Sequence, residues 1–260
     1  MKTRGESYRT DIASSTPDSI TVFGRDFPSE ILGKLNFGDM AFLELTSRIP
    51  NENESRMFNA MLVTLVEHGL TPSTLVARLT YLGAPESLQG AVAAGLNGLG
   101  NVFVGSTEGA ARMLYEAPQP VQGEDLHDVA TQVVVSFEQQ ERQIPGIGHP
   151  FHKPVDPRAP RLIQIAEETG FDGRYLRLIQ KIAEVAGTRK GRALPANATG
   201  ILGALCCEMG LEWKICRGLG VMARAVGIVG HLLEEGRSPI ARKLWLETEA
   251  RATEHLHRGE

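Results

Sequence analysis

Residues 145–161 read PGIGHPFHKPVDPRAPR, a stretch that cannot form the interior of a helix. Each proline removes a backbone donor and clashes with the preceding turn, and the segment is too basic for a buried strand. Gly146 and Gly148 flank Ile147 and leave little side chain in front of His149. Two interpretations follow: an ordinary linker, or a backbone shaped to hold an anionic group beside a histidine.

Helical periodicity predominates on both sides of this stretch. Asn51 can cap a helix with an apolar stripe, and Thr71 followed by Pro72 is typical of a second helix start. The expected helices cover residues 52–69, a segment from 72, then 87–100, 107–117, 122–142, 159–169, 174–187, 197–210, 213–235 and 240–248. The clear strand signal is SITVFGRDF at residues 19–27, with Gly24 as its turn. The sequence therefore predicts an all-α fold with a short N-terminal β-hairpin, and a frayed or solvent-facing tail from residue 249.

The overall composition narrows the class of protein. At 260 residues, with 42% hydrophobic and 22% charged residues, the chain can bury the core of one large domain or two lobes. A net charge of -4 argues against nucleic acid and anionic membranes as partners. The N-terminus lacks the apolar stretch of a signal peptide, and we expect no apolar run long enough to span a bilayer. Three cysteines, with Cys206 and Cys207 adjacent, fit buried thiols in a reducing compartment, so we expect a cytoplasmic protein.

A zinc site is one interpretation of the histidines in the opening stretch. His149, His152 and Asp156 lie close together in the sequence. Pro150 and Pro154 prevent one helical face from presenting all three, and no CxxC or HExxH motif accompanies them. We therefore predict no metal site.

Several other positions have both a structural and a functional interpretation. His68 follows a helix, where a histidine is often only a favourable partner of the helix dipole. Arg224 lies in an apolar helix, so its charge must be paired or face a cleft, and His231 on the same face is expected to be a core histidine. The NATG sequence at residues 197–200 is either a glycosylation acceptor in a secreted chain or a helix start capped by Asn197.

Five segments, taken in order, resemble the citrate synthase superfamily. They read VEHGLTPSTLVARL (66–79), GLNGLGNVFVGSTEGAARML (95–114), PGIGHPFHKPVDPRAPRL (145–162), LPANATGILGALCCEMGL (194–211) and VMARAVGIVGHLLEE (221–235). The resemblance covers roughly residues 28–245. The chain length and the GNVFVG segment are most similar to the short citryl-CoA lyase branch, which includes the C-terminal lyase module of ATP-citrate lyase.

This resemblance implies a citrate synthase-like helical fold and a homodimer or higher homo-oligomer. A large helical domain would comprise residues 1–104 and 196–260, and residues 105–195 would form a small domain that carries the CoA-binding loop. The active site would lie in the cleft between the two domains. A coenzyme A thioester would be the substrate, and the chemistry needs no prosthetic group.

The resemblance also implies roles for individual residues. His68 matches the histidine that holds the acetyl thioester oxygen, and His149 matches the one that exchanges a proton with the C3 oxygen of the hydroxyacyl group. Arg158 and Arg224 match arginines that bind substrate carboxylates. The residues expected to contact coenzyme A are Pro145, Gly146, Ile147, Gly148 and, near its phosphates, Lys153.

The sequence departs from the family pattern in three places, which together comprise four residues. Thr199 occupies the place of the catalytic aspartate, and a threonine cannot act as a carboxylate base. Phe103 and Val104 replace the oxaloacetate-binding His-Gly-Gly motif, as in members of the lyase branch, so we expect Phe103 at the substrate. Pro150 stands where an arginine is common.

Three functional hypotheses are consistent with this pattern. The first is a lyase that cleaves citryl-CoA, or a related 3-hydroxy-3-carboxyacyl-CoA, to acetyl-CoA and a 2-oxo acid such as oxaloacetate. The second is a catalytically degenerate protein that binds CoA esters, which the loss of the aspartate at Thr199 favours. The third is a citrate synthase-like acyltransferase that uses another 2-oxo acid.

Overall fold

The computed structural model describes residues 8–118, 125–149 and 151–257. Its internal contacts divide the chain into two units, one up to Asn59 and one from Ala60 onward. Each unit is described by itself below.

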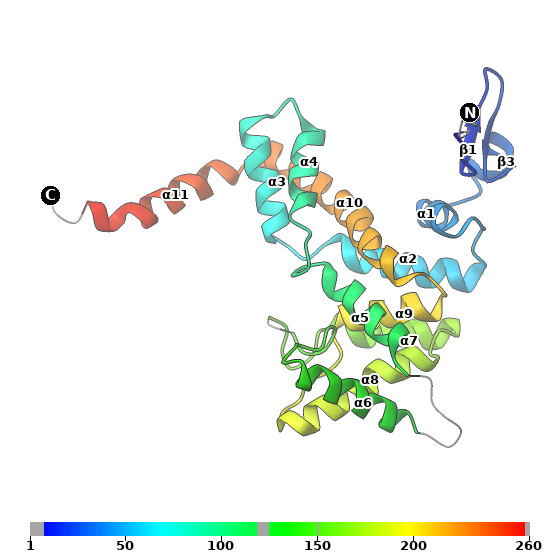
Figure 1. Cartoon of the computed structure of the whole chain (residues 1–260). Helices are drawn as coiled ribbons and strands as arrows, with labels where there is room; N and C mark the ends of the chain where they lie inside the picture. The colour runs from blue at the N-terminus through cyan, green and yellow to red at the C-terminus, as the bar shows by residue number, and fades with distance from the viewer. Residues whose placement is uncertain (1–7, 119–124, 150, 258–260) are drawn as a thin grey trace, which may run out of the picture. The chain divides into compact units, whose positions relative to one another are not determined.

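The first unit begins with a small antiparallel sheet (Figure 1). Strands β1 (Ala13–Ser15), β2 (Ile20–Val22) and β3 (Arg25–Asp26) pair in that order, with Ala13 opposite Val22. Gly24 makes the turn between β2 and β3 with a φ of +75°, a conformation that glycine adopts without strain. A π-helical turn, η1 (Phe27–Ile31), and helix α1 (Phe37–Thr46) follow. Their buried core is Val22, Ile31 and Leu43.

Helix α2 (Glu52–Val66) starts at a reciprocal capping box. The Asn51 side chain accepts a hydrogen bond from the Glu54 amide at 2.9 Å, and the Glu54 carboxylate accepts one from the Asn51 amide at 2.8 Å. Phe42 of α1 and Phe58 of α2 pack edge to face with ring centroids 5.3 Å apart. The cap predicted at Asn51 is confirmed.

The second unit contains the other described helices. They are α3 (Pro72–Gly83), α4 (Leu88–Asn97), α5 (Gly105–Glu116), α6 (Leu126–Gln139), α7 (Arg158–Thr169), α8 (Arg174–Lys190), α9 (Ala198–Glu208), η2 (Trp213–Ile215), α10 (Cys216–Arg237), α11 (Ala241–Thr253) and η3 (Glu254–Leu256).

Helix α9 is the centre of one helical group in this unit. All its residues from Ile201 to Cys207 are buried, and it packs against α5, α7 and α8, while α6 covers α8. A second group consists of α3, α4 and α10, whose shared core is Ala77, Ala91, Ile228 and Leu232. Helix α10 also contacts α5 and so joins the two groups (Figure 1).

Two connections bring the predicted functional residues together. His68 lies in the short connection between α2 and α3, and His149 lies in the long connection between α6 and α7. Both segments belong to the second unit, so their relative positions can be described.

The predicted all-α fold with a small N-terminal sheet is confirmed. The sheet has a third strand, β1, which the alternation signal missed because its Ala-Ser-Ser sequence is fully exposed and has low β propensity. Helix α1 was also missed, although Asn36 caps it. The described part of the tail, residues 249–257, is mostly exposed, which is one of the two expected outcomes, and it is helical through Thr253. The division into residues 1–104 with 196–260 and 105–195 remains a prediction.

The expectation that no apolar run could span a bilayer is wrong for one helix. Residues Trp213–Arg237 are long and apolar enough by length and composition alone. In the fold, this segment packs against α3, α4 and α5. A buried core helix satisfies the same two criteria.

Candidate active site

The glycines of the opening stretch allow its backbone to lie directly on the start of α9. A Cβ added to Gly146, which has a φ of +84°, would lie 2.5 Å from the Gly200 Cα. A Cβ added to Gly200 would lie 2.2 Å from the Gly146 carbonyl oxygen. Only glycine fits at either position, which explains both the PGIG sequence and the glycine of NATG.

Hydrogen bonds fix this loop to the segment before α9. Ile147 and Ala196 form an isolated antiparallel bridge, and the Asn197 amide donates to the Gly146 carbonyl at 3.0 Å. The Asn197 side chain caps α9 by accepting from the Gly200 amide, as predicted, and donates to the Gly148 carbonyl. The Gly148 amide donates to the Pro195 carbonyl at 2.7 Å. This amide is therefore used within the chain and is not available to an anionic group.

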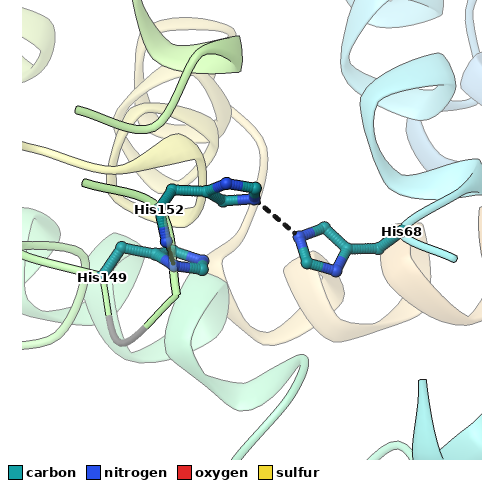
Figure 2. Close-up of side chains that lie close together, drawn as sticks. All are labelled: His68, His149 and His152. Atoms are coloured by element: carbon teal, nitrogen blue, oxygen red, sulfur yellow. Dashed lines mark hydrogen bonds between the residues drawn. The ribbon is translucent and has the colours of Figure 1, made fainter. Parts of the chain in front are cut away.

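Three histidine rings meet at the end of this loop (Figure 2). His149 and His152 come from the connection between α6 and α7, and His68 comes from the connection between α2 and α3. The His68 Nε2 and the His152 Nε2 are 3.0 Å apart, a hydrogen bond in which one ring donates and the other accepts. The rings of His68 and His149 have centroids 6.2 Å apart. The structure thus brings the two predicted catalytic histidines together and adds His152.

The backbone determines which nitrogen of the neutral His149 ring carries the proton. Its Nδ1 accepts hydrogen bonds from the amides of Phe151 at 3.1 Å and His152 at 2.9 Å. Because Nδ1 is the acceptor, the proton of the neutral ring is on Nε2. His149 can therefore donate a hydrogen bond from Nε2 to an oxygen in front of it.

Burial and neighbouring cations keep both predicted catalytic histidines neutral. Burial lowers the pKa of His68, and the positive charge of Arg158 lowers it further. Burial also lowers the pKa of His149, against the opposing effect of the Asp156 carboxylate. Neutral imidazoles near pH 7 can donate or accept protons, as acid–base chemistry requires.

Asp156 fixes the position of Arg158. Its carboxylate accepts from the Arg158 Nε at 3.0 Å and from the Arg158 Nη2 at 2.9 Å, and it also accepts from the Ala198 amide at 3.0 Å. Burial of Asp156 opposes its ionisation, but these hydrogen bonds outweigh that effect and lower its pKa to about 2. These hydrogen bonds hold the Arg158 guanidinium in place. Because its side chain is still 26% exposed, its remaining donors are open to a ligand.

Arg224 of α10 has a buried donor without a partner. Its Nη1 is buried and has no hydrogen-bond partner among the residues that the structure describes. Burial lowers the pKa of Arg224, the Glu67 carboxylate opposes this effect, and the charge of Arg158 adds to it. Arg158 and Arg224 therefore place two positive charges beside His68, in a region suited to carboxylate groups.

A chain of polar side chains that begins at a buried arginine, and that sequence reasoning missed, reaches the backbone of His68. Arg78 of α3, 1% exposed, donates to the His231 Nδ1 at 2.8 Å. Since arginine only donates, the His231 Nδ1 is the acceptor, and its Nε2 donates to the Glu67 carboxylate at 3.2 Å. The Glu67 carboxylate in turn accepts from the His68 amide at 3.2 Å. His231, predicted to be a core histidine, is partly buried, with 13% of its side chain exposed, and it links Arg78 to Glu67.

The remaining predicted site residues lie around this centre. Thr199 is in the first turn of α9, where its hydroxyl donates to the Asn197 side-chain oxygen at 2.7 Å. Phe103 is 49% exposed in the connection between α4 and α5, and its ring contacts none of the three histidines in the part of the chain that the structure describes. Lys153 is exposed beside His152, and Pro150 lies outside the described residues.

An apolar cavity of about 560 Å³ adjoins the same loop. Its walls come from α7, α8 and the segment before α9, and they include Pro154, Ala159, Gly187, Arg192 and Pro195. The Pro195 carbonyl also accepts a hydrogen bond from the Gly148 amide. The wall of the cavity is therefore bonded directly to the histidine loop, the segment that carries His149 and His152. This volume is in the range that holds small-molecule ligands.

Comparisons with known proteins agree with the resemblance described above. Residues 31–244 match the family model described as citrate synthase, C-terminal domain. A citrate synthase from Heyndrickxia coagulans is 25% identical over 229 residues, which are 86% of this chain and 59% of that protein. The chain spans only about half the length of the curated relatives that it matches.

Two solved structures share the fold over most of the chain. A citryl-CoA lyase from Hydrogenobacter thermophilus is 32% identical with a TM-score of 0.79, and the match covers 88% of this chain and 87% of that one. An ATP citrate lyase from Methanothrix soehngenii, solved with citrate and coenzyme A, is 22% identical with a TM-score of 0.73 over 89% of this chain and 39% of that one. Because the family model covers most of the sequence and a solved relative of similar length is 32% identical, the chain belongs to the citrate synthase family.

Proposed function

We propose that this protein is a carbon–carbon lyase of the citryl-CoA lyase type. It cleaves citryl-CoA, or a related 3-hydroxy-3-carboxyacyl-CoA, to acetyl-CoA and a 2-oxo acid. The similarity in length and sequence to the citryl-CoA lyase from Hydrogenobacter thermophilus supports this assignment.

The observation that carries the proposal is the meeting of His68 with His149 beside two arginines. The two rings lie 6.2 Å apart between centroids, and the charges of Arg158 and Arg224 both act on His68. A substrate with carboxylates at one end and a thioester at the other needs such an arrangement. The arginines bind the carboxylates while the histidines serve the two ends of the breaking bond.

The reaction is a retro-aldol type (retro-Claisen) cleavage. His149 removes the proton from the C3 hydroxyl, the bond between C2 and C3 breaks, and a carbonyl forms at C3. The electron pair of the broken bond moves to the acetyl thioester as an enolate, which His68 holds by a hydrogen bond to its oxygen. Solvent, or another residue in place of the missing aspartate, protonates the enolate carbon to give acetyl-CoA, and His149 releases its proton to solvent. Each positioned acid or base contributes about 100- to 10,000-fold to the rate.

The hydrogen bonds of His149 add a requirement to this mechanism. Because Nδ1 accepts from the amides of Phe151 and His152, Nε2 carries the proton. In this state Nε2 can donate a hydrogen bond to the carbonyl oxygen of the 2-oxo acid product. Removing the proton from the alcohol needs a free Nε2 lone pair. We therefore propose that substrate binding opens these two backbone hydrogen bonds and reverses the tautomer.

We propose that the cavity beside the loop holds part of coenzyme A. Its apolar walls suit the adenine or pantetheine, and Arg192 on its wall and the exposed Lys153 near it offer positive charge for phosphates. Pro145, Gly146, Ile147 and Gly148, the predicted coenzyme A contacts, do not line the cavity, but the Gly148 amide donates to Pro195 on its wall.

The test is direct cleavage of citryl-CoA. The purified protein is incubated with citryl-CoA, and oxaloacetate is followed through NADH oxidation by malate dehydrogenase. We expect turnover by the unmodified protein and a loss of at least about 100-fold in His149→Ala, with CoA binding retained. His127→Ala, a change of an exposed histidine on α6, is the matched control and should turn over normally.

Two outcomes would contradict this assignment. Full turnover by His149→Ala would remove the proposed role of that ring. No oxaloacetate from the unmodified protein, with CoA binding intact, would exclude citryl-CoA as the substrate.

A second candidate function is a degenerate protein that binds CoA esters without turning them over. The supporting observation is that the Thr199 hydroxyl is engaged with Asn197 at 2.7 Å at the place where the family has a catalytic carboxylate. This candidate predicts CoA binding without product, and creation of activity by Thr199→Asp. If Thr199→Asp stays inactive while binding CoA, this second candidate is wrong as well.

A further inference from the structure

The histidine cluster contains more donors than the proposed reaction uses. One ring nitrogen from each of His68, His149 and His152 lies within 4.8 Å of those of the other two (Figure 2). The ring centroids of His149 and His152 are 4.6 Å apart, and those of His68 and His152 are 5.2 Å apart. His152 has no role in the cleavage mechanism, so its position in this cluster calls for an explanation of its own.

The spacing of the nitrogens fits a shared metal ion. Zinc binds histidine nitrogen at about 2.0–2.1 Å, so two nitrogens on one tetrahedral zinc lie about 3.3 Å apart. The His68 Nε2 and the His152 Nε2 are already 3.0 Å apart. We infer that His68, His149 and His152 form a binding site for a divalent transition metal such as Zn²⁺, with an open fourth position.

The donor set selects the class of metal. Three imidazoles and no carboxylate suit zinc, copper, nickel or cobalt, whereas magnesium and calcium prefer oxygen ligands. Asp156, which the sequence placed beside His149 and His152 in a zinc motif, has both oxygens engaged by Arg158 and the Ala198 amide. The third ligand comes instead from His68, more than 80 residues earlier in the chain. The prediction of no metal site rested on the prolines and on the absence of CxxC and HExxH motifs, and it did not include His68, which comes from a separate connection.

Two features oppose metal binding and determine which histidines bind the metal first. The His149 Nδ1 holds the amides of Phe151 and His152, so coordination through either ring nitrogen of His149 must break these hydrogen bonds. Arg158 and Arg224 also repel a cation at this position. His68 and His152 are therefore the primary pair, and His149 joins after its loop adjusts. Phe151 is 80% exposed, so the loop can move without disturbing a packed core.

A bound metal would switch off the proposed reaction. It occupies the ring nitrogens with which, in the cleavage mechanism, His68 donates a hydrogen bond to the enolate oxygen and His149 removes a proton. This consequence rests on the proposed function, whereas metal binding itself does not.

The experiment measures binding and inhibition separately. Metal-free full-length protein without substrate is titrated with Co²⁺, whose visible absorption reports nitrogen coordination, and the Co²⁺ is then displaced with Zn²⁺. We expect one Co²⁺ per chain, displaced by Zn²⁺. We also expect the Kd of His152→Ala to rise by more than the roughly 10- to 100-fold that loss of an outer hydrogen bond to a ligand causes. His127→Ala, which removes an exposed histidine on α6, should bind Co²⁺ like the unmodified protein. His68→Asn is the second ligand variant, used if His152→Ala does not fold by circular dichroism.

Each result decides one part of the inference. Absence of Co²⁺ binding, or equal binding by the unmodified protein and a folded ligand variant, would overturn the metal site. Loss of binding in His127→Ala would assign the ion to surface histidines instead. In the second arm, citryl-CoA cleavage is measured with Zn²⁺ and after adding a chelator. Binding without inhibition would overturn only the regulatory consequence, and a protein that binds Co²⁺ but never cleaves citryl-CoA would overturn the proposed function while leaving the metal site intact.

Discussion

Asp156 connects Arg158 to the start of α9. Its carboxylate holds Arg158 at two points and caps the first amide of α9, and the residue is only 1% exposed. Asp156→Asn removes the charge and leaves Arg158 without its partner. We expect the free energy of unfolding in urea to fall by about 2 kcal/mol, the usual scale for a hydrogen bond to a charged group. The control Glu116→Gln disrupts an exposed ion pair with Arg112 and should cost less than about 0.5 kcal/mol.

The same residue gives the stability a specific pH dependence. The pKa of Asp156 is lowered from 3.8 to about 2, so its charged form stabilises the folded state. That contribution is fully present above the unfolded pKa and is lost as the pH falls through the folded one. The difference between the unmodified protein and Asp156→Asn should therefore be constant above about pH 5 and shrink between about pH 4 and pH 2. A difference that stays constant down to pH 2 would show that the carboxylate is not stabilised by its partners.

Among individual residues, the sequence predicted part of the site. Matched motifs named His68 and His149, and the structure brings them together. His152 and Asp156 were noticed only as neighbours in the sequence, because proximity along the chain does not show which group each side chain meets. Arg78 was missed altogether, since its partners lie more than 150 residues away on α10.

The contact between the histidine loop and α9 leaves no room for a side chain on either backbone. A Cβ on Gly200 would lie 2.2 Å from the Gly146 carbonyl oxygen, and backbone cannot yield as a flexible side chain does. We expect Gly200→Ala to reduce the free energy of unfolding by about 2 kcal/mol or more, the scale of forced overpacking, and to impair turnover. The matched control is Gly218→Ala in α10, where a Cβ meets nothing within 4 Å. That change should be neutral or stabilise the helix by up to about 1 kcal/mol. Equal effects of the two substitutions, measured in urea, would contradict the close approach.

The pairing of α3 with the end of α10 depends on one buried ion cluster. Arg78 donates to the Glu235 carboxylate at 2.8 Å, and the same carboxylate accepts the amides of Ile240 and Ala241 at the start of α11. Arg78→Met leaves a buried carboxylate without its cation. We expect a loss of about 3 kcal/mol or more in unfolding free energy, partly restored by adding Glu235→Gln. If the double variant is no more stable than Arg78→Met alone, the unpaired charge is not the cause of the loss.

Helix starts were predicted well where a local chemical signal marks them. Asn51 and Asn197 cap their helices with their side chains, as expected. Thr71 also precedes its helix, with Pro72 at the first position, but its side chain makes no capping hydrogen bond. Strand β1 lacks such a signal, since it is held mainly by its pairing with β2. Local propensity could not predict an element whose stability comes from a partner strand.

For the whole molecule, the homodimer remains a prediction. A groove between α3 and α11 is lined by Leu79, Leu82, Gly83, Arg242 and Trp245, and Trp245 is 55% exposed. Exposed apolar side chains gathered on two helices are typical of a surface that meets another copy. We expect light scattering to show a dimer, and Trp245→Glu to shift it toward monomer. Tyr115→Glu, at a 59% exposed position on α5, should leave the dimer unchanged, and an unaltered dimer in Trp245→Glu would exclude this groove as the interface.

The attachment of the histidine loop to α9 also bears on how the chain folds. The bridge between Ile147 and Ala196 and the hydrogen bond from Asn197 to Gly148 join residues about 50 positions apart, whereas most helical hydrogen bonds span four. Closing so long a segment costs entropy that local helix formation does not, so helices can form before this loop is in place. A partly folded chain can therefore show nearly full far-ultraviolet helical signal while its three histidines are still apart. Hydrogen exchange at the Gly148 and Asn197 amides, rather than helix content, is the measure of whether the site has formed.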